Sequence, residues 1–132
     1  MKVQFLGVGD QFSTDGQYHS NMVITADSGA NILIDCGSDV KYSLMESKID
    51  PTDIDAVYIS HLHADHIGGL EWLLLGTYFN GQNKRLKLFC EEKLQSDLWH
   101  NSLKGGLECI GIKCMELSDY FDCYPLTEGG GF

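Results

Sequence analysis

A short apolar segment runs directly into a cluster of three histidines and one aspartate, and this feature constrains the chain more than any other. Residues 54–59 read Ile-Asp-Ala-Val-Tyr-Ile and predict a strand, after which His61, His63, Asp65 and His66 follow. Alternate side chains of an extended segment point the same way, so the first two histidines and the aspartate are expected to converge, while His66 turns toward a neighbouring point. Imidazole nitrogen and carboxylate oxygen suit zinc, and also manganese or iron. The sequence therefore predicts a metal site at the end of this strand.

The alternative interpretation of the cluster is a solvated loop that happens to be rich in histidine. That interpretation gives no reason for the regular spacing or for the position directly after an apolar strand. Gly68 and Gly69 follow the cluster, and glycine lets the backbone turn sharply where a Cβ would crowd bound ions. The metal interpretation is therefore favoured.

Alternating and helical hydrophobic patterns predict a layered fold around this cluster. The pattern predicts strands at 2–9, 21–26, 31–35, 54–59, 86–90 and 109–117, and helices at 40–48, 69–78 and 91–103. The last of these helices is expected to end at Gly105-Gly106. Asp119 and Asp122 are expected in a solvated turn around Tyr120 and Phe121. Because strands and helices alternate, the fold class is α/β or α+β, with a mixed sheet and flanking helices.

Length and composition fit one small domain over residues 1–132, with a flexible tail at about 127–132. The formal charge of −10 argues against a nucleic-acid partner, because binding phosphates needs clustered lysine and arginine. No apolar run reaches the roughly 20 residues that span a membrane. The five cysteines and an N-terminus without a signal-peptide pattern predict a cytoplasmic protein, with all five thiols reduced and buried.

The segment 61–69, His-Leu-His-Ala-Asp-His-Ile-Gly-Gly, matches the HxHxDH motif of the metallo-β-lactamase-fold superfamily. Residues 5–9 resemble the opening strand and glycine turn of that superfamily, and residues 32–37 resemble its strand ending in an Asp-x-Gly turn. The resemblance covers about residues 1–115. Together with the dipeptide Ser20-Asn21, these landmarks are most similar to the branch of tRNA 3′-processing endonucleases and cyclic-nucleotide phosphodiesterases.

The resemblance implies a role for each motif residue. His61 and His63 would bind a first metal, and Asp65 and His66 a second, with zinc expected and manganese or iron as alternatives. A water activated by the metals would attack the substrate, and Asp65 would orient it or accept its proton. The same resemblance makes three neighbours of the motif supporting residues: Asp35, Ser60 and Gly68.

Complete members of the superfamily are four-layer αββα sandwiches of two similar halves, and this chain resembles the N-terminal half. The resemblance implies that the second half brings further metal ligands. Outside the motif, only His19 and His100 remain as possible additional histidine ligands, although a surface position is favoured for both. Half of a sandwich leaves an apolar sheet face uncovered, so a homo-oligomer or a complementing second half is expected.

Three functions remain open. The first is a metal-dependent hydrolase that cleaves a phosphodiester bond in a small nucleotide-like substrate. The second is a truncated, non-catalytic protein that binds metal or a partner through an inherited motif. The third is a thioester or lactam hydrolase, because water activated by two metals attacks carbonyl carbon as well as phosphorus. Fold alone does not choose the substrate.

Overall fold

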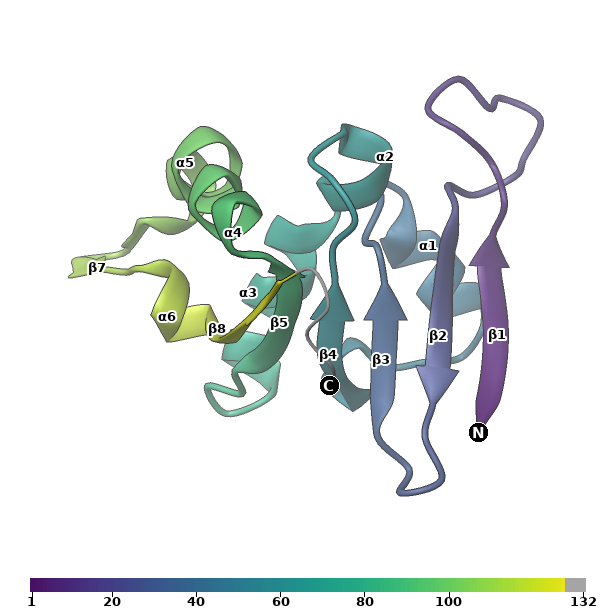
Figure 1. Cartoon of the computed structure of the whole chain (residues 1–132), viewed down its shortest axis with the longest axis horizontal. Helices are drawn as coiled ribbons and strands as arrows, with labels where there is room; N and C mark the ends of the chain where they lie inside the picture. The colour runs from purple at the N-terminus through teal and green to yellow at the C-terminus, as the bar shows by residue number, and fades with distance from the viewer. Residues whose placement is uncertain (128–132) are drawn as a thin grey trace.

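A six-stranded mixed sheet forms the centre of the molecule in the computed structural model, which describes residues 1–127 (Figure 1). Its strands are β1 (Lys2–Gly7), β2 (Asn21–Thr25), β3 (Asn31–Ile34), β4 (Ile54–Tyr58), β5 (Leu86–Glu91) and β8 (Phe121–Leu126). They lie in the order β1-β2-β3-β4-β5-β8, antiparallel as far as β3 and parallel from β3 onward. The expected mixed α/β sheet with flanking helices is confirmed.

Short helices connect the parallel strands, as parallel pairing requires. They are α1 (Val40–Glu46), the 3₁₀ turn η1 (Pro51–Asp53), α2 (Ala64–Ile67), α3 (Leu70–Asn80), α4 (Glu92–Leu98), the π-helical turn η2 (Trp99–Leu103), α5 (Lys104–Leu107) and α6 (Leu117–Tyr120). A small hairpin, β6 (Cys109–Ile110) and β7 (Lys113–Cys114), lies between α5 and α6. Within residues 1–127, no helix is long and apolar enough to cross a membrane.

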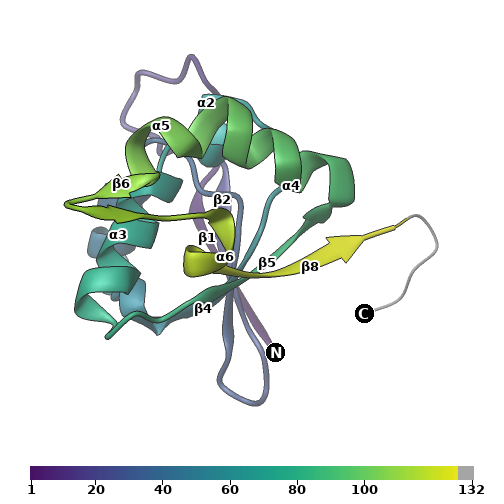
Figure 2. The ribbon, with the colours of Figure 1, turned by 90° about the vertical axis from the view of Figure 1, so that its left-hand side faces the viewer.

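One face of the sheet carries the hydrophobic core. Val23, Leu33, Val57 and Leu88 are aligned across four strands and are buried with side chains of α1 and α3. Figure 2 shows α3 on this side of the sheet. Strands that alternate inward and outward residues bury one face only, so the opposite residues of the same strands point away from this core.

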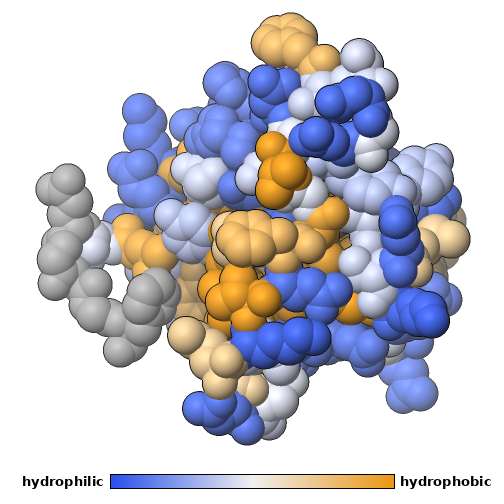
Figure 3. Space-filling view, turned by 90° about the vertical axis from the view of Figure 1, so that its right-hand side faces the viewer, coloured by the Kyte–Doolittle hydropathy of each residue, from blue (hydrophilic) through white to orange (hydrophobic). Residues whose placement is uncertain are grey.

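The opposite face, here called the open sheet face, carries a second apolar row. The strand registers align Phe5, Met22, Ile34, Tyr58, Phe89 and Tyr124. Phe5 is 65% exposed, and the central members of the row are half-buried. Figure 3, which views the molecule from the β1 edge of the sheet, shows apolar side chains gathered at that edge. The expectation of an apolar sheet face left uncovered by this chain agrees with this arrangement.

The C-terminal region differs most from the sequence prediction. Residues 109–117 do not form one strand, because Gly111 at φ 63° reverses the chain and makes a hairpin. Tyr120 and Phe121 are fully buried, so the predicted solvated turn is wrong. A capping box between Glu116 and Asp119 starts α6, and β8 then adds an edge strand beside β5. The predicted tail lies, beyond Thr127, outside the described residues.

The helix predicted at 91–103 continues past its expected end at Gly105-Gly106, which is also a correction. The chain passes from α4 through η2 into α5, which ends at Leu107. Leu107 is fully buried, and its carbonyl accepts a 2.9 Å hydrogen bond from the Tyr120 hydroxyl. This packing outweighs the roughly 1 kcal/mol that each helical glycine costs.

The prediction that all five cysteines are buried is correct for two of them. Cys36 and Cys90 lie in the core, whereas Cys109, Cys114 and Cys123 are exposed. Cys123 is exposed on the edge strand β8, whereas for Cys109 and Cys114 the error follows from assigning residues 109–117 to a strand in the sheet. The hairpin that actually forms there stands away from the sheet.

Candidate metal centre

The histidine motif lies at the C-terminal end of β4, where the chain turns into α2. His61 and His63 follow the strand and precede the helix, whereas Asp65 and His66 lie in the single turn of α2. The predicted extended conformation therefore holds only as far as His63, whose ψ is 150°. This change of conformation places Asp65 beside His66, whereas the alternation had predicted that Asp65 converges with His61 and His63.

His61 and His63 form the first pair. The His61 Nε2 and His63 Nδ1 atoms are 3.1 Å apart, and the ring centroids are 4.6 Å apart. The Ser60 hydroxyl lies 3.0 Å from His61 Nδ1 and within hydrogen-bond distance of both Asp35 carboxylate oxygens. Because the hydroxyl has one proton to donate to Asp35, we assign the Nδ1 proton to His61. His61 Nε2 is then unprotonated and faces its partner.

Asp65 and His66 form the second pair. His66 Nδ1 is 2.8 Å from Asp35 Oδ2, and His66 Nε2 is 3.2 Å from Asp65 Oδ2. When the neutral ring donates its Nδ1 proton to Asp35, Nε2 carries a lone pair and lies opposite an Asp65 carboxylate oxygen. Asp65 Oδ1 is buried and has no hydrogen-bond partner. Both features fit a cation between or beside these atoms.

The two pairs are adjacent, because the His61 and His66 rings approach to 4.0 Å between centroids. Each pair supplies two donors, and within residues 1–127 no three or more His, Cys, Asp or Glu side chains form a metal-binding group. Catalytic zinc sites usually have three protein ligands. The geometry therefore fits two neighbouring metal positions that each need a further ligand.

Asp35 organises both pairs from the end of β3. Its carboxylate accepts hydrogen bonds from the Ser60 backbone N–H at 2.9 Å, from the Ser60 hydroxyl and from His66. Asp35 is buried and adopts a left-handed conformation with φ 56°, which Asp and Asn tolerate better than most residues. This turn aims the carboxylate at Ser60 and His66.

Backbone contacts fix the turn after β3 against the motif. Cys36 donates its N–H to the His66 carbonyl at 2.7 Å and accepts the Gly69 N–H at 2.9 Å. A Cβ on Gly68 would overlap the Ser38 hydroxyl and the Ala64 carbonyl, so glycine is required for this close approach. Burial raises the pKa of the Cys36 thiol far above its usual range, so this sulfur remains a neutral packing group.

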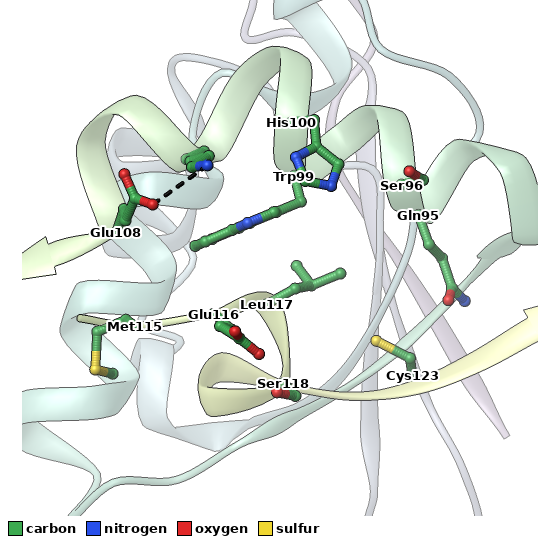
Figure 4. Close-up of a pocket in the computed structure, with 11 residues that line it drawn as sticks. Gln95, Ser96, Trp99, His100, Glu108, Met115, Glu116, Leu117, Ser118 and Cys123 are labelled. Carbon is green, nitrogen blue, oxygen red and sulfur yellow. Dashed lines mark ion pairs between the residues drawn. The ribbon is translucent and has the colours of Figure 1, made fainter.

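The two histidines outside the motif lie in different places. His19 packs beside Gly37, which also contacts the Asp65 backbone, so the structure brings His19 close to the motif. The backbone N–H of His19 donates to Asp39 Oδ2 at 2.9 Å, and the ring atom Nδ1 of His19 lies 3.4 Å from Asp39 Oδ1. His100 instead lines a separate pocket, shown in Figure 4, to which no motif residue contributes.

A pocket of about 560 Å³ lies directly beside the motif, and it was not predicted from the sequence. His63, Ala64 and Asp65 form one side of the pocket, and residues 10–12 form the other. The Asp10 carboxylate accepts the Phe12 N–H at 2.9 Å and holds the loop in a tight turn. Phe12 is 85% exposed at this position. The signal in the sequence is the aromatic side chain of Phe12 within the polar segment 10–17.

Comparison with solved structures identifies the class of fold. The short form of human tRNase Z matches with a TM-score of 0.65 and 27% identity, covering 80% of this chain and 40% of that one. The metallo-β-lactamase fold protein YhfI from Bacillus subtilis matches with a TM-score of 0.67 and 19% identity, covering 95% of this chain and 45% of that one. The chain has the metallo-β-lactamase fold over the part that it spans.

The family is narrower than the fold. A family model described as Anti-Pycsar protein Apyc1 matches residues 1–132, and the chain belongs to this family. The Apyc1 protein of Paenibacillus xerothermodurans is 34% identical over 128 residues, which are 97% of this chain and 50% of that protein. The Apyc1 protein of Bacillus phage BSP38 is 39% identical over 121 residues, covering 91% and 47%. The chain thus spans about half the length of the curated relatives it matches.

Proposed function

We propose that this chain carries the metal-binding part of a hydrolase that cleaves a phosphodiester bond in a small, nucleotide-like substrate, with cyclic nucleotides as the preferred class. The observation that carries the proposal is the pairing of donor atoms at the end of β4. Family membership and the likeness to tRNase Z support phosphodiester chemistry over the alternatives.

Each donor pair holds one metal ion in this proposal. His61 Nε2 and His63 Nδ1 bind the first, and Asp65 with His66 Nε2 binds the second, with zinc preferred and manganese or iron as alternatives. When bound, the ions acidify water and neutralise charge on the phosphate. Asp65 Oδ1, which has no other hydrogen-bond partner, orients the attacking water and accepts its proton.

The pocket beside His63 and Asp65 is the proposed seat of the substrate. A phosphate bound at the donor pairs would leave the rest of a nucleotide next to residues 10–12. The exposed ring of Phe12 offers a flat apolar surface, and aromatic rings stack on any nucleobase. The pocket thus suits a substrate with one charged end and one aromatic end.

A second layer on the open sheet face completes the site in this proposal. The exposed apolar row supports burial against another sheet, and two donors per metal leave room for ligands from that layer. A second copy of the chain or a complementing half-domain would supply it. Sedimentation of the chain at micromolar concentration tests whether a second copy supplies this layer. A dimer is expected. A monomer would exclude the second copy and leave a complementing half-domain as the source.

The incomplete ligand count also supports a second candidate, a non-catalytic protein that binds metal through the motif. Hydrolysis assays separate the two functions. Zinc-loaded protein is assayed on cyclic mononucleotides, on bis(p-nitrophenyl) phosphate and on a β-lactam, which covers the third function considered from the sequence. Turnover of the cyclic nucleotides without turnover of the β-lactam supports the proposal. Bound zinc without turnover of any substrate, in the dimeric or complemented state, would favour the non-catalytic protein.

A further inference from the structure

Two exposed thiols face each other across the small hairpin between α5 and α6. The register pairs Cys109 of β6 with Cys114 of β7, and Ile110 with Lys113 next to the turn. Gly111 has φ 63° and begins the two-residue loop, as a type II′ turn requires. Both cysteines are free thiols. The hairpin therefore holds two reactive groups directly opposite each other.

Hydrogen bonding identifies which kind of cross-strand pair the cysteines form. In an antiparallel hairpin, hydrogen-bonded and non-hydrogen-bonded pairs alternate. Met115 donates its N–H to the Glu108 carbonyl at 2.7 Å, so residues 108 and 115 form a hydrogen-bonded pair. The cysteines are the next pair along, and they therefore occupy a non-hydrogen-bonded position, where side chains come closest.

This position suits a disulfide that forms without moving the backbone. The Cα atoms of a non-hydrogen-bonded pair are about 4.5 Å apart, and disulfides occur at Cα separations of about 4.4–6.8 Å. The separation is thus at the short end of the permitted range. Disulfides that are strained and exposed are reduced more readily than buried structural ones. A bond here would be reversible.

We propose that Cys109 and Cys114 form a reversible, redox-active disulfide whose oxidant is a small-molecule disulfide such as glutathione disulfide. One hairpin thiolate attacks a sulfur of the small disulfide and releases one small thiol, leaving a mixed disulfide on the protein. The other hairpin thiolate then attacks the protein sulfur and releases the second small thiol. Two electrons pass to the small disulfide, and the two protons lost by the cysteines are taken up by the released thiols.

The bond would act on a pocket of about 470 Å³ that the hairpin helps to form. Glu108 and Met115, the neighbours of the two cysteines, line this pocket together with Trp99 and Leu117 (Figure 4). Fixing the two strands of the hairpin together would fix the separation of Glu108 from Met115. Because the bond forms without moving the backbone, it would hold this wall of the pocket in its present arrangement, and no residue of the histidine motif lines the pocket.

Peptide mapping tests the proposal, because trypsin cuts after Lys113, between the two cysteines. The experiment uses the Cys123→Ser variant, which removes the third exposed thiol. After treatment with glutathione disulfide and alkylation, we expect the peptides 105–113 and 114–132 to remain linked until reduction. Two thiols per chain should be lost, with no glutathione retained.

The Cys109→Ser variant in the same background is the matched control, and Cys114 should then keep one glutathione. The proposal would be overturned by separate glutathione adducts on Cys109 and Cys114, by links between two chains, or by two unreacted thiols. Comparison with the otherwise native chain checks that the Cys123→Ser change does not create the reaction.

Discussion

The histidine motif and the C-terminal elements from η2 to β8 are held in the fold by different forces. Around the motif, Asp35 gathers Ser60 and His66 through charged hydrogen bonds on a partly exposed edge. In the C-terminal region, Tyr120 and Trp99 pack into the core with few polar contacts. The difference predicts that metal binding and folding can be changed separately. Changes at the motif should alter metal binding, and changes in the C-terminal region should alter folding.

The largest effect on stability is expected from Tyr120→Ala. The side chain is fully buried, and removing a buried aromatic costs about 3–5 kcal/mol of unfolding free energy. Urea unfolding measures the loss. Tyr120→Phe is the control, because it removes only the hydrogen bond to Leu107 and should cost about 1 kcal/mol. Equal losses in the two variants would show that packing does not dominate this region.

The next largest effect is expected on metal affinity and tests the histidine motif. His63→Ala removes one of the two donors at the first proposed metal position, so zinc affinity there should fall by more than the roughly 10–100-fold typical of supporting residues. Competition with a chromogenic chelator measures the affinity. His100→Ala changes an exposed histidine in the other pocket and should bind zinc normally. Equal zinc affinity in both variants would remove His63 from the site.

Asp35→Asn sharpens the comparison because it changes charge with little change of shape. Asparagine tolerates the left-handed conformation of residue 35, so the backbone should remain in place. The amide cannot polarise His66 as a carboxylate does, and zinc affinity should fall by about 10–100-fold. Urea unfolding of the metal-free variant is the control. A large loss of stability with unchanged affinity would make Asp35 a structural residue only.

The smallest effect lies away from both regions, at the ion pair between Asp55 and Lys84. Burial raises the pKa of Asp55, but the Asn31 N–H and the Lys84 ammonium outweigh it and hold the pKa below its usual value. The folded state therefore gains stability above about pH 4, which is lost as the pH falls through the lowered pKa. Asp55→Asn should cost about 0.5 kcal/mol at neutral pH and less in acid. A loss that grew in acid would contradict this assignment.

The same contrast explains how much the sequence could predict. Strong local patterns mark the strand at 54–59, the motif that follows this strand, and the hairpin at 21–35. The structure has these strands in those places. The helix α2 was missed because four residues are too few to show a helical period. Whether the four motif residues bind metal remains a prediction.

The C-terminal elements could not be predicted because their conformation depends on distant contacts. β8 is a strand only because residues 121–126 pair with β5, which is 35 residues earlier at each paired position, as Leu86 with Phe121 illustrates. The helical path through Gly105-Gly106 depends on the burial of Leu107. The pocket at Phe12 likewise requires a loop to fold back beside Asp65. Such contacts leave no local pattern.

Metal stoichiometry tests the central claim most directly. The chain is purified without chelator, equilibrated with zinc, separated from free metal and analysed by plasma mass spectrometry. Two donor pairs predict up to two zinc ions per chain, both reduced in a variant that combines His63→Ala with Asp65→Ala. The same zinc content in the native chain and the double variant, or no zinc in the native chain, would contradict the account.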